Sequence, residues 1–351
     1  MPTTMRVATF NCENLFSRPK IFFESARRSS ELLGYVSELQ AALQSDVIDH
    51  ARIQSLKSKL KGYAAVSDIR GKHKKAGGAA DWLGFVELAR SEINDVAVEN
   101  TARVIRDVNA DVICLIEVEN RILLQKFHDN ILYKKFLKGA KLPGYRYNML
   151  IDGNDERGID VSVMSRLPIL WLRSHVHERT MYDGREVPTF SRDCLEVQVE
   201  SPDGNPIHLL VNHFKSMGYS SPRDPQSNRR RLGQSKRVAD LVGEHNLLQA
   251  YVVVAGDLNS DPSSPSLAPL VNKAGLYNIN LELASSERGT YKSGNKQLDY
   301  LFVSDALKQR LQAVRIERRG MFVKKWPHYA EVTSDRTAAS DHAAVVADFQ
   351  L

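Results

Sequence analysis

The sequence predicts an α/β fold in which helices cover β-sheets. Eight short apolar runs have the length and composition of buried strands, and amphipathic helical patterns lie between several of them. Strands that alternate with helices along a chain are typical of an α/β domain. The expected strands are Arg6–Phe10, Asp111–Glu117, Asp160–Ser165, Cys194–Glu200, Ile207–Asn212, Tyr251–Ala255, Leu298–Ser304 and Ala343–Phe349.

Two helices are expected inside this pattern, at Asn94–Val108 and Arg229–His245, because each carries apolar residues at helical spacing. Residues 17–98 interrupt the alternation between the first two strands. The parts expected there are a helical stretch at 30–60, a glycine- and lysine-rich loop at 71–78 and a second helical piece at about 80–94. We therefore expect one domain over residues 1–351, with a mainly helical insertion at about 17–98.

Composition indicates a globular protein with a core of its own. Of the 351 residues, 42% are hydrophobic and 26% are charged, so the chain can bury a core without disulfides or a structural metal. Its three cysteines, Cys12, Cys114 and Cys194, are too widely spaced for a disulfide framework or a zinc knuckle, and we expect them to be reduced. No secretory signal or membrane-spanning stretch is apparent, which favours a cytoplasmic protein without membrane association.

Polar residues stand at the ends of the expected strands, where α/β folds gather their active sites. Taken singly, each has an ordinary explanation: Asn11 can cap a turn, and a lone His213 is usually structural. Together, their carboxylates and amides form the oxygen-rich ligand set that suits Mg²⁺ or Mn²⁺ rather than structural zinc. The residues in question are Asn11, Glu117, His213, Asp257, Asn259, Asp299, Asp341 and His342.

In this order, the segments resemble the endonuclease/exonuclease/phosphatase superfamily, which includes deoxyribonuclease I, exonuclease III and abasic-site endonucleases. The most specific combination is Gly-Asp-Leu-Asn at 256–259 followed by Ser-Asp-His at 340–342. The segment Asn-His-Phe-Lys-Ser at 212–216 is most similar to bacterial nucleases of the extracellular type. The resemblance covers residues 1–16 and about 100–351, and the insertion lies outside it.

The resemblance implies a four-layer α/β/β/α sandwich of two mixed sheets with outer helices. It further implies that the metal is held by Asn11, Glu117 and Asp341, with Asp257 and Asn259 close by. His342 and His213 would contact the scissile phosphate, and Asp299 would orient His342. The chemistry agrees, since a cation and imidazolium donors stabilise the charge that develops on phosphate oxygens. A carboxylate with an amide neighbour, such as Asp257 with Asn259, can orient and deprotonate the attacking water, although the identity of the general base stays open.

Nucleic acid is the expected substrate, with DNA favoured over RNA. The net charge is +6, and a basic run follows the strand that ends at His213. Such a run attracts a polyanion, although a solvated helix face explains it equally well. The expected phosphate contacts are Asn212, Lys215, Arg157, Arg229, Arg230 and Arg231. No base-reading element is apparent, so sequence preference is expected to be weak.

Two other functions are compatible with the sequence. The same catalytic residues serve phosphatases and phosphodiesterases that act on small molecules or lipids. A binding or scaffold protein without activity is the third possibility, and the intact set of catalytic residue types argues against it. The sequence does not distinguish endo- from exonuclease action or indicate a protein partner.

Overall fold

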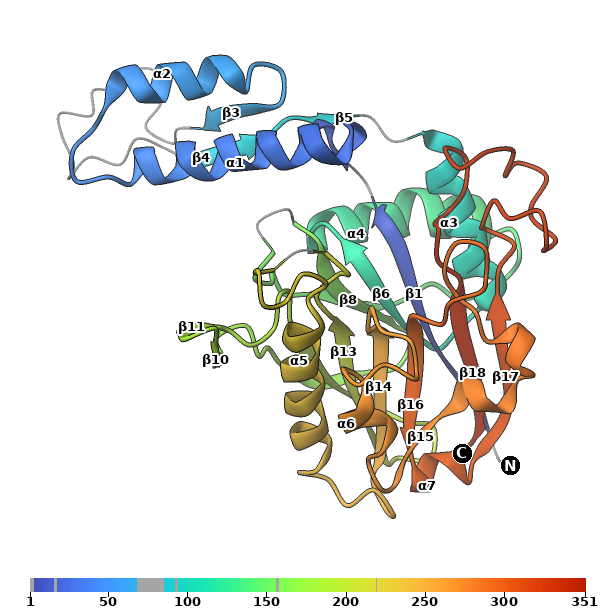
Figure 1. Cartoon of the computed structure of the whole chain (residues 1–351). Helices are drawn as coiled ribbons and strands as arrows, with labels where there is room; N and C mark the ends of the chain where they lie inside the picture. Colours follow the sequence, from blue (N-terminus) through green and yellow to red (C-terminus); the bar gives the residue numbers. More distant parts are fainter. Residues whose placement is uncertain (1–2, 16–17, 68–84, 92–93, 156–157, 219) are drawn as a thin grey trace. The chain divides into compact units, whose positions relative to one another are not determined.

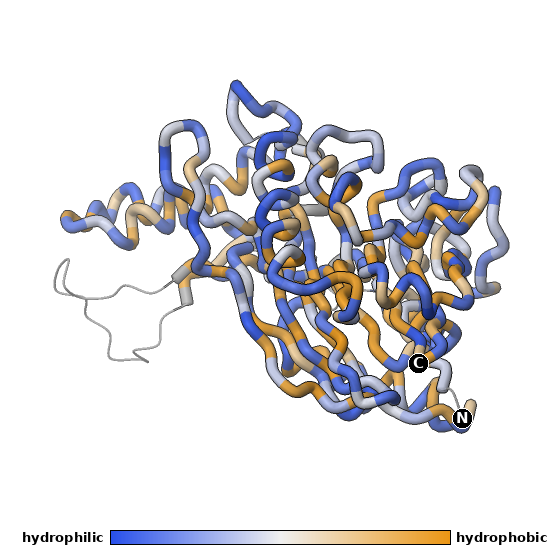
Figure 2. Tube along the Cα trace, turned by 90° about the horizontal axis from the view of Figure 1, so that it is seen from below, coloured by the Kyte–Doolittle hydropathy of each residue, from blue (hydrophilic) through white to orange (hydrophobic). Residues whose placement is uncertain are grey.

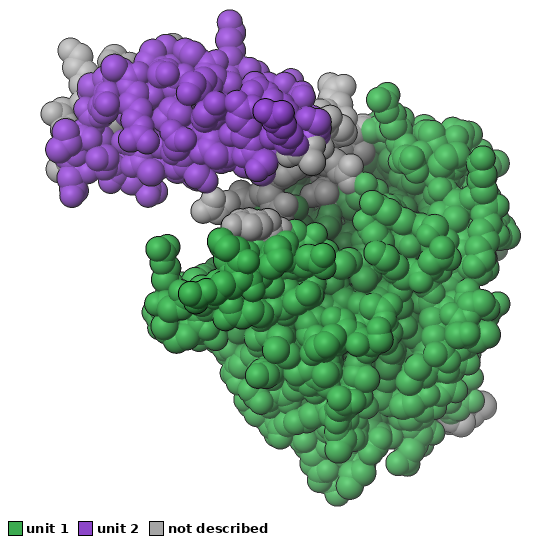
Figure 3. Space-filling view, in the orientation of Figure 1, with its two compact units in different colours: residues 1–16, 94–351 green, residues 17–93 purple. Residues whose placement is uncertain are grey.

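A computed structural model describes residues 3–15, 18–67, 85–91, 94–155, 158–218 and 220–351. The chain forms two compact units (Figure 3). Unit 1 consists of Met1–Phe16 and Asn94–Leu351, and unit 2 consists of Ser17–Ile93. The predicted contact residue Arg157 and the loop at 71–78 lie outside the described residues.

Unit 1 contains two six-stranded sheets (Figure 1). The first has the strand order β17-β18-β1-β6-β8-β7, in which only β1 and β6 run parallel. Its strands are β1 (Thr4–Leu15), β6 (Val112–Val118), β7 (Tyr147–Leu150), β8 (Asp160–Ser165), β17 (Leu311–Glu317) and β18 (Ala344–Gln350). The first and last strands of the chain pair side by side in this sheet.

The second sheet repeats this plan, with the order β15-β16-β14-β13-β12-β9 and one parallel pair, β13 with β14. Its strands are β9 (Ile169–Arg173), β12 (Cys194–Glu200), β13 (Pro206–His213), β14 (Tyr251–Asp257), β15 (Leu276–Asn278) and β16 (Asp299–Ser304). A separate hairpin joins β10 (Arg179–Tyr182) to β11 (Arg185–Pro188).

The main core lies between the two sheets, because alternate strand residues point to opposite faces. Val7, Val112 and Val345 of the first sheet join Val197, Val211 and Val253 of the second in one buried cluster. The outer face of each sheet has its own apolar cluster beneath helices. In Figure 2 the hydrophobic residues follow the strands, whereas the outer loops are largely hydrophilic.

Helices cover both outer faces and complete the predicted four-layer sandwich (Figure 1). The first sheet is covered by α3 (Asp95–Val108), α4 (Arg121–Phe127) and a π-helix (His128–Leu137). The second is covered by α5 (Asn228–Val242) and α6 (Ala268–Val271). The side chain of Asn94 caps α3 by accepting the Val96 N–H, and α3 buries its apolar stripe against the sheet. The smaller α7 (Asp305–Lys308) follows β16.

Unit 2 has a hydrophobic cluster of its own, which includes Ile21, Leu32, Leu39, Leu56 and Leu60. Its elements are β2 (Arg18–Pro19), a 3₁₀ turn (Lys20–Phe23), α1 (Ala26–Leu43), α2 (His50–Lys59), β3 (Ala64–Ser67), β4 (Phe85–Leu88) and β5 (Arg90–Ser91). The helix expected at about 80–94 is wrong for the described part, because Phe85–Leu88 pairs with Ala64–Ser67 as a hairpin. In the described part of the chain, no helix is both long and apolar enough to cross a bilayer.

Candidate active site

Four side chains meet where the two parallel strand pairs end. Asn11 and Glu117 come from β1 and β6, and His213 and Asp257 come from β13 and β14. Asn11 Nδ2 donates to Asp257 Oδ2 at 3.0 Å and to Glu117 Oε1 at 3.4 Å. His213 Nε2 lies 3.7 Å from Asp257 Oδ2 and 3.8 Å from Glu117 Oε1. The cluster therefore joins both sheets of the sandwich.

Irregular backbone shapes the first-sheet half of this cluster. The β6–β8 register shifts between Ile116 and Val118, and Glu117 between them has a φ of 65°. The β1–β6 register shifts after Asn11, and Glu13 in this stretch has a φ of 50°. Bulges re-aim side chains, and left-handed backbone in non-glycine residues concentrates at functional sites. We attribute the inward aim of Glu117 to this bulge.

Gly256 brings Asp257 beside His213 in the second sheet. Its φ is 133°, and a Cβ atom there would lie 1.9 Å from the carbonyl oxygen of Asn212 on the paired strand. Only glycine allows so close a backbone approach. As a result, His213 and Asp257 occupy opposing positions in the parallel ladder, next to the pair formed by Asn212 and Gly256.

His342 completes the cluster from the turn before β18. Its Nδ1 lies 2.8 Å from Asp299 Oδ2, so the carboxylate accepts the imidazole N–H and fixes the ring. Nε2 lies 3.8 Å from both Asp257 Oδ2 and Asp341 Oδ1. The Tyr291 ring packs against the imidazole with centroids 4.7 Å apart. His342 thus presents Nε2 to the same carboxylate as His213.

Asn259 fixes the second carboxylate oxygen of Asp257, Oδ1. Its backbone N–H donates to Asp257 Oδ1 at 2.9 Å, and its Nδ2 donates to the carbonyl oxygen of Phe214 at 3.2 Å. Asn259 has a φ of 47°, a conformation that asparagine tolerates better than most residues. The Asp-Leu-Asn turn therefore fixes the carboxylate rather than leaving it on a loose loop.

Burial and neighbouring charges shift the pKa values of Asp257 and His342. Burial raises the pKa of Asp257 to about 7, with His342 lowering it and Asp299 raising it. Burial alone lowers the pKa of His342, but the Asp299 and Asp257 carboxylates outweigh it, so this pKa lies well above its ordinary value. These carboxylates therefore favour the protonated form of His342.

The chemistry of the donors fits a hard divalent cation. Asn11, Glu117, Asp257 and Asp341 offer amide and carboxylate oxygens, which Mg²⁺ and Mn²⁺ prefer. Asp257 is buried, and its carboxylate lies beside Asn11 and within 4 Å of the imidazoles of His213 and His342. The donor set of Asp257, Asp299 and His342 has ligand atoms within 4.8 Å of one another.

Comparison with known proteins places this geometry in a family. The model of the Endonuclease/Exonuclease/phosphatase family matches residues 86–342, which is more than half of the chain. The chain belongs to the Endonuclease/Exonuclease/phosphatase family. Enzymes of this family are hydrolases that act on phosphoesters, and they typically use divalent metals. No curated protein matches the sequence.

Solved structures of this family share the fold. An Endonuclease/Exonuclease/phosphatase family protein of Bacteroides thetaiotaomicron aligns over 100% of both chains, with 14% identity and a TM-score of 0.54. A protein from Bacteroides vulgatus aligns over 99% of both chains, with 13% identity and a TM-score of 0.53. The human nocturnin catalytic domain has 15% identity and a TM-score of 0.50, covering 74% of this chain and 88% of that chain. At these identities the likeness shows the fold alone.

Three residues next to the candidate site were not expected from the sequence. Glu13 Oε2 accepts the Asp341 N–H at 3.1 Å and so connects β1 to the turn before β18. The backbone N–H of Lys292 donates to the Asp341 carbonyl oxygen at 2.8 Å. The ring of Tyr291 packs on the imidazole of His342. Glu13 stands two positions after Asn11 in the motif, which was a usable signal. The segment at 291–292 carries no such signal.

The three consecutive arginines at 229–231 have partners that the sequence did not indicate. Arg231 is 2% exposed and donates to Ser260 Oγ at 3.0 Å and to the Lys215 carbonyl oxygen at 3.1 Å. Arg229 pairs with Asp183 at 2.6 Å, and Arg230 donates to the Pro188 carbonyl oxygen at 2.8 Å. The expected phosphate contacts of these arginines stay predictions, and in this structure all three guanidinium groups already bond to acceptors within the chain.

The two remaining expected contacts differ from each other. Asn212 is fully buried and donates to the Leu210 carbonyl oxygen at 3.0 Å, and its expected contact with substrate stays a prediction. Lys215 lies two residues beyond His213, and its N–H donates to Gln234 Oε1 at 2.9 Å. Lys215 thus starts from a fixed backbone position close to the site.

A second group of candidate metal ligands lies elsewhere on the second sheet. Glu196, His208 and His245 have ligand atoms within 4.8 Å of one another. Glu196 Oε2 also lies 3.3 Å from His175 Nε2 and 3.5 Å from Arg173 Nε. Because an arginine already neutralises this carboxylate, we place the metal in the strand-end cluster instead.

Proposed function

We propose that the chain is a divalent-metal-dependent nuclease that hydrolyses phosphodiester bonds of DNA with little sequence preference. The observation that carries the proposal is the convergence of two imidazoles on one buried carboxylate. The Nε2 atoms of His213 and His342 lie 3.7 and 3.8 Å from Asp257 Oδ2. Imidazole donors beside a carboxylate that can bind water fit the hydrolysis of an anionic ester.

Mg²⁺ or Mn²⁺ is the proposed cofactor. Asn11, Glu117, Asp257 and Asp341 would hold it, with Asn259 close by. When bound, the ion supplies a Lewis acid that polarises the phosphate and stabilises the charge on its oxygens.

The side chains of the cluster have separate roles in the proposed reaction. His342, oriented by Asp299, donates its Nε2–H to the leaving oxygen as the bond from that oxygen to phosphorus breaks, and His213 donates a hydrogen bond from the other sheet to a phosphate oxygen. Asp257 orients the attacking water and accepts its proton, a role that suits a pKa of about 7. Asn259 keeps the Asp257 carboxylate in place through the 2.9 Å hydrogen bond to Oδ1. Asp299 is a positioning residue, since it acts through His342.

Nucleic acid as the substrate is supported by charge and by the motifs. The net charge of +6 attracts polyanions, and Lys292 lies next to the metal-side Asp341. The motif resemblance to deoxyribonuclease I favours DNA over RNA.

A phosphatase or phosphodiesterase acting on a small-molecule or lipid phosphoester is the second candidate. The observation in its favour is that the guanidinium groups of Arg229, Arg230 and Arg231 donate hydrogen bonds to acceptors within the chain. Their charge was the clearest sign of a polyanion groove in the sequence, and these guanidinium groups already have acceptors within the chain.

Cleavage of labelled plasmid, single-stranded DNA and RNA with Mg²⁺ or Mn²⁺ tests the proposal. We expect cleavage of DNA that EDTA stops and added metal restores. His342→Ala is expected to lower the rate by roughly 10²- to 10⁴-fold, because general acid–base groups contribute on that scale. His177→Ala, which changes an exposed histidine outside the cluster, is the matched control.

Each outcome separates the candidates. Turnover that survives exhaustive chelation removes the metal from the mechanism. Intact nucleic acid together with phosphate release from a small-molecule panel selects the second candidate. A fully active His342→Ala protein excludes the proposed site under either candidate.

A further inference from the structure

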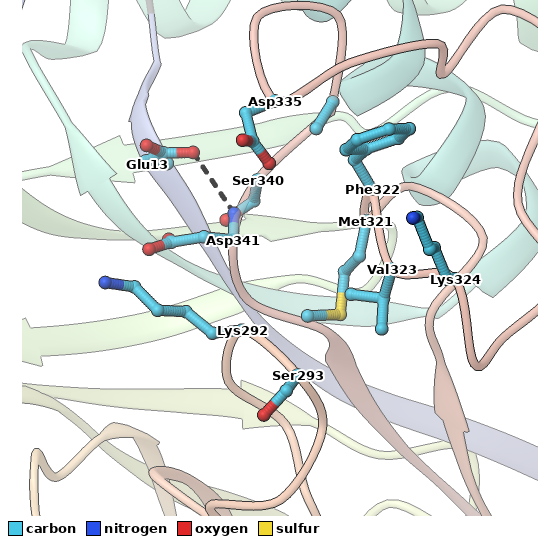
Figure 4. A pocket seen from close by; sticks show the side chains of 11 residues that line it. Glu13, Lys292, Ser293, Met321, Phe322, Val323, Lys324, Asp335, Ser340 and Asp341 are labelled. Atoms are coloured by element: carbon cyan, nitrogen blue, oxygen red, sulfur yellow. Dashed lines mark hydrogen bonds between the residues drawn. The ribbon is translucent and has the colours of Figure 1, made fainter.

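A pocket of about 610 Å³ adjoins the candidate active site on the side of Asp341. Glu13 and Asp341 form one part of its lining, and Met321, Phe322, Val323 and Lys324 form another (Figure 4). Lys292, which bonds the Asp341 backbone, lines it as well. Its volume falls within the range of pockets that enclose whole small ligands. A ligand in this pocket would lie next to Asp341, one of the proposed metal ligands.

The outer wall of this pocket is built by the connection between β17 and β18, which is anchored to the sandwich. Asn100 Nδ2 on α3 donates to the Thr337 carbonyl oxygen at 2.7 Å, and Thr101 Oγ1 donates to that of Ala339 at 3.1 Å. Both residues are buried. The connection is therefore held from behind by a core helix, so its pocket-facing residues have a fixed support.

The turn that carries Lys292 is locked to the same connection. A Cβ atom on Gly294 would lie 2.6 Å from Trp326 Nε1, so the indole packs directly on the backbone of this turn. The Arg318 guanidinium lies 4.4 Å from the centroid of the Trp326 ring, and its Nη2 donates to the Gly289 carbonyl oxygen at 2.9 Å. The two walls are thus preformed, which lowers the entropic cost of binding a ligand between them.

The lining combines an aromatic surface with cations. The Phe322 side chain is 38% exposed, although a ring of this size is normally buried. Exposed Lys292 and Lys324 also line the pocket. An acyl chain would have to desolvate both ammonium groups and the Asp335 carboxylate, which is unfavourable. A nucleotide supplies a flat base for the ring and a phosphate for the lysines, as in proteins that bind single-stranded nucleic acid.

We propose that this pocket binds the nucleotide next to the scissile phosphate, with its base stacked on Phe322 and its phosphate near Lys324. The inference rests on the proposed nuclease function and adds a binding subsite for a base. It makes Phe322 a specificity-determining residue, which favours substrates whose bases are unpaired and free to stack.

Two measurements on the full chain test the subsite. The first is hydrolysis of a single-stranded oligonucleotide and of an abasic oligonucleotide of the same length, which keeps the phosphates and has no bases. Phe322→Ala is expected to lower kcat/KM for the oligonucleotide with bases about ten-fold or more, on the scale of one lost base stack. Hydrolysis of the abasic oligonucleotide is expected to change less than about two-fold, because it has no base stack to lose. Phe322→Tyr is expected to restore oligonucleotide cleavage.

The second measurement is binding of the same oligonucleotide in EDTA, followed by fluorescence anisotropy, which needs no turnover. Phe322→Ala is expected to weaken binding, and Lys324→Ala is expected to reduce its salt dependence. Tyr133→Ala is the matched control, because Tyr133 is also 38% exposed and lies on the π-helix. Lys138→Ala serves the same purpose for the lysine. Thermal melting confirms that each variant is folded.

The inference and the proposed function fail differently. Cleavage and binding of the oligonucleotide that are unchanged in Phe322→Ala overturn the subsite and leave the nuclease intact. An equal loss on both substrates also overturns it, because Phe322 would then act through the catalytic centre. A wild-type chain that hydrolyses bis(p-nitrophenyl) phosphate but not the oligonucleotide overturns the nuclease and the subsite together.

Discussion

Asp299 affects the proposed reaction through the proton on His342. Its Oδ2 lies 2.8 Å from His342 Nδ1, and it raises a pKa that burial alone would lower. Asp299→Asn removes this charge, so we predict that the imidazolium loses its proton at a lower pH. The rate should fall roughly 10²-fold or more, on the scale of a lost general acid. The alkaline limb of the kcat/KM profile should move to lower pH.

A pH–rate profile of Asp299→Asn beside Asp240→Asn checks this. Asp240 is exposed on α5 and provides the same chemical change away from the site. A reduced rate with an unshifted alkaline limb would assign Asp299 a merely structural role.

Asp160 makes stability depend on pH. It is 3% exposed, and burial raises its pKa to about 7, with Asp152, Asp155 and Asp193 adding to the rise. The Gly153 N–H, which donates to its Oδ1 at 2.9 Å, opposes this shift. The ordinary value is 3.8, so between these values the folded chain binds a proton that the unfolded chain has lost. The free energy of unfolding therefore falls as pH rises through this range.

We predict that Asp160→Asn removes most of this pH dependence, because asparagine keeps the acceptor for Gly153 without the charge. Urea unfolding of both proteins from pH 5 to 8 measures it, with the variant gaining stability relative to wild type as pH rises. Parallel curves for the two proteins would contradict the assignment.

Residue-level expectations succeeded where a strand end determines the position. Asn11, Glu117, His213 and Asp257 were expected together, and the structure brings them together because parallel strands end at one edge. Their catalytic and metal-binding roles remain predictions. Glu13 was missed although it stands in the motif, because the placement of its side chain depends on its own left-handed backbone. The partners of the arginine run could not be predicted, since Asp183, Pro188 and Ser260 are distant in sequence.

Helix α5 depends on a buried arginine rather than on its exposed ones. Arg231 connects α5 to the segment after β13 through the Lys215 carbonyl oxygen and to the segment after β14 through Ser260. We predict that Arg231→Ala destabilises the protein by roughly 3 kcal/mol, because it deletes charged hydrogen bonds in a buried position. Arg229→Ala should have a much smaller effect, since half of that side chain is exposed.

Chemical denaturation of the two variants compares these roles within one helix. Equal losses of stability would show that burial does not distinguish the arginines. Hydrolysis of bis(p-nitrophenyl) phosphate by Arg231→Ala adds a second readout, because the segments it connects carry His213 and Asp257.

Buried strands were predicted from the sequence more reliably than exposed strands. All eight expected strands are present, and β8, β14 and β16 are buried along their whole length. Edge strands such as β17 and the β10–β11 hairpin were missed, because their exposed residues dilute the apolar pattern. The four-layer arrangement was available only through the resemblance, since periodicity does not specify how two sheets face each other.

We predict that unit 1 folds without unit 2. The three hydrophobic clusters of unit 1 include no described residue of Ser17–Ile93, whose own cluster is distinct. We predict that replacing residues 17–93 with a short glycine–serine linker leaves unit 1 folded and able to hydrolyse bis(p-nitrophenyl) phosphate. Circular dichroism and thermal melting measure the fold. Loss of cooperative melting would mean that unit 1 needs the insertion.

The site draws its residues from two sheets, and this has a consequence for the folding chain. Neither sheet alone carries both the Asn11–Glu117 pair and the His213–Asp257 pair. The chain enters the first sheet, builds the second and returns to the first with β17 and β18. A nascent chain on the ribosome therefore lacks Asp341 and His342 until every strand of the second sheet has been made. Under the proposed function, the emerging chain cannot cleave nucleic acid before β18 is in place.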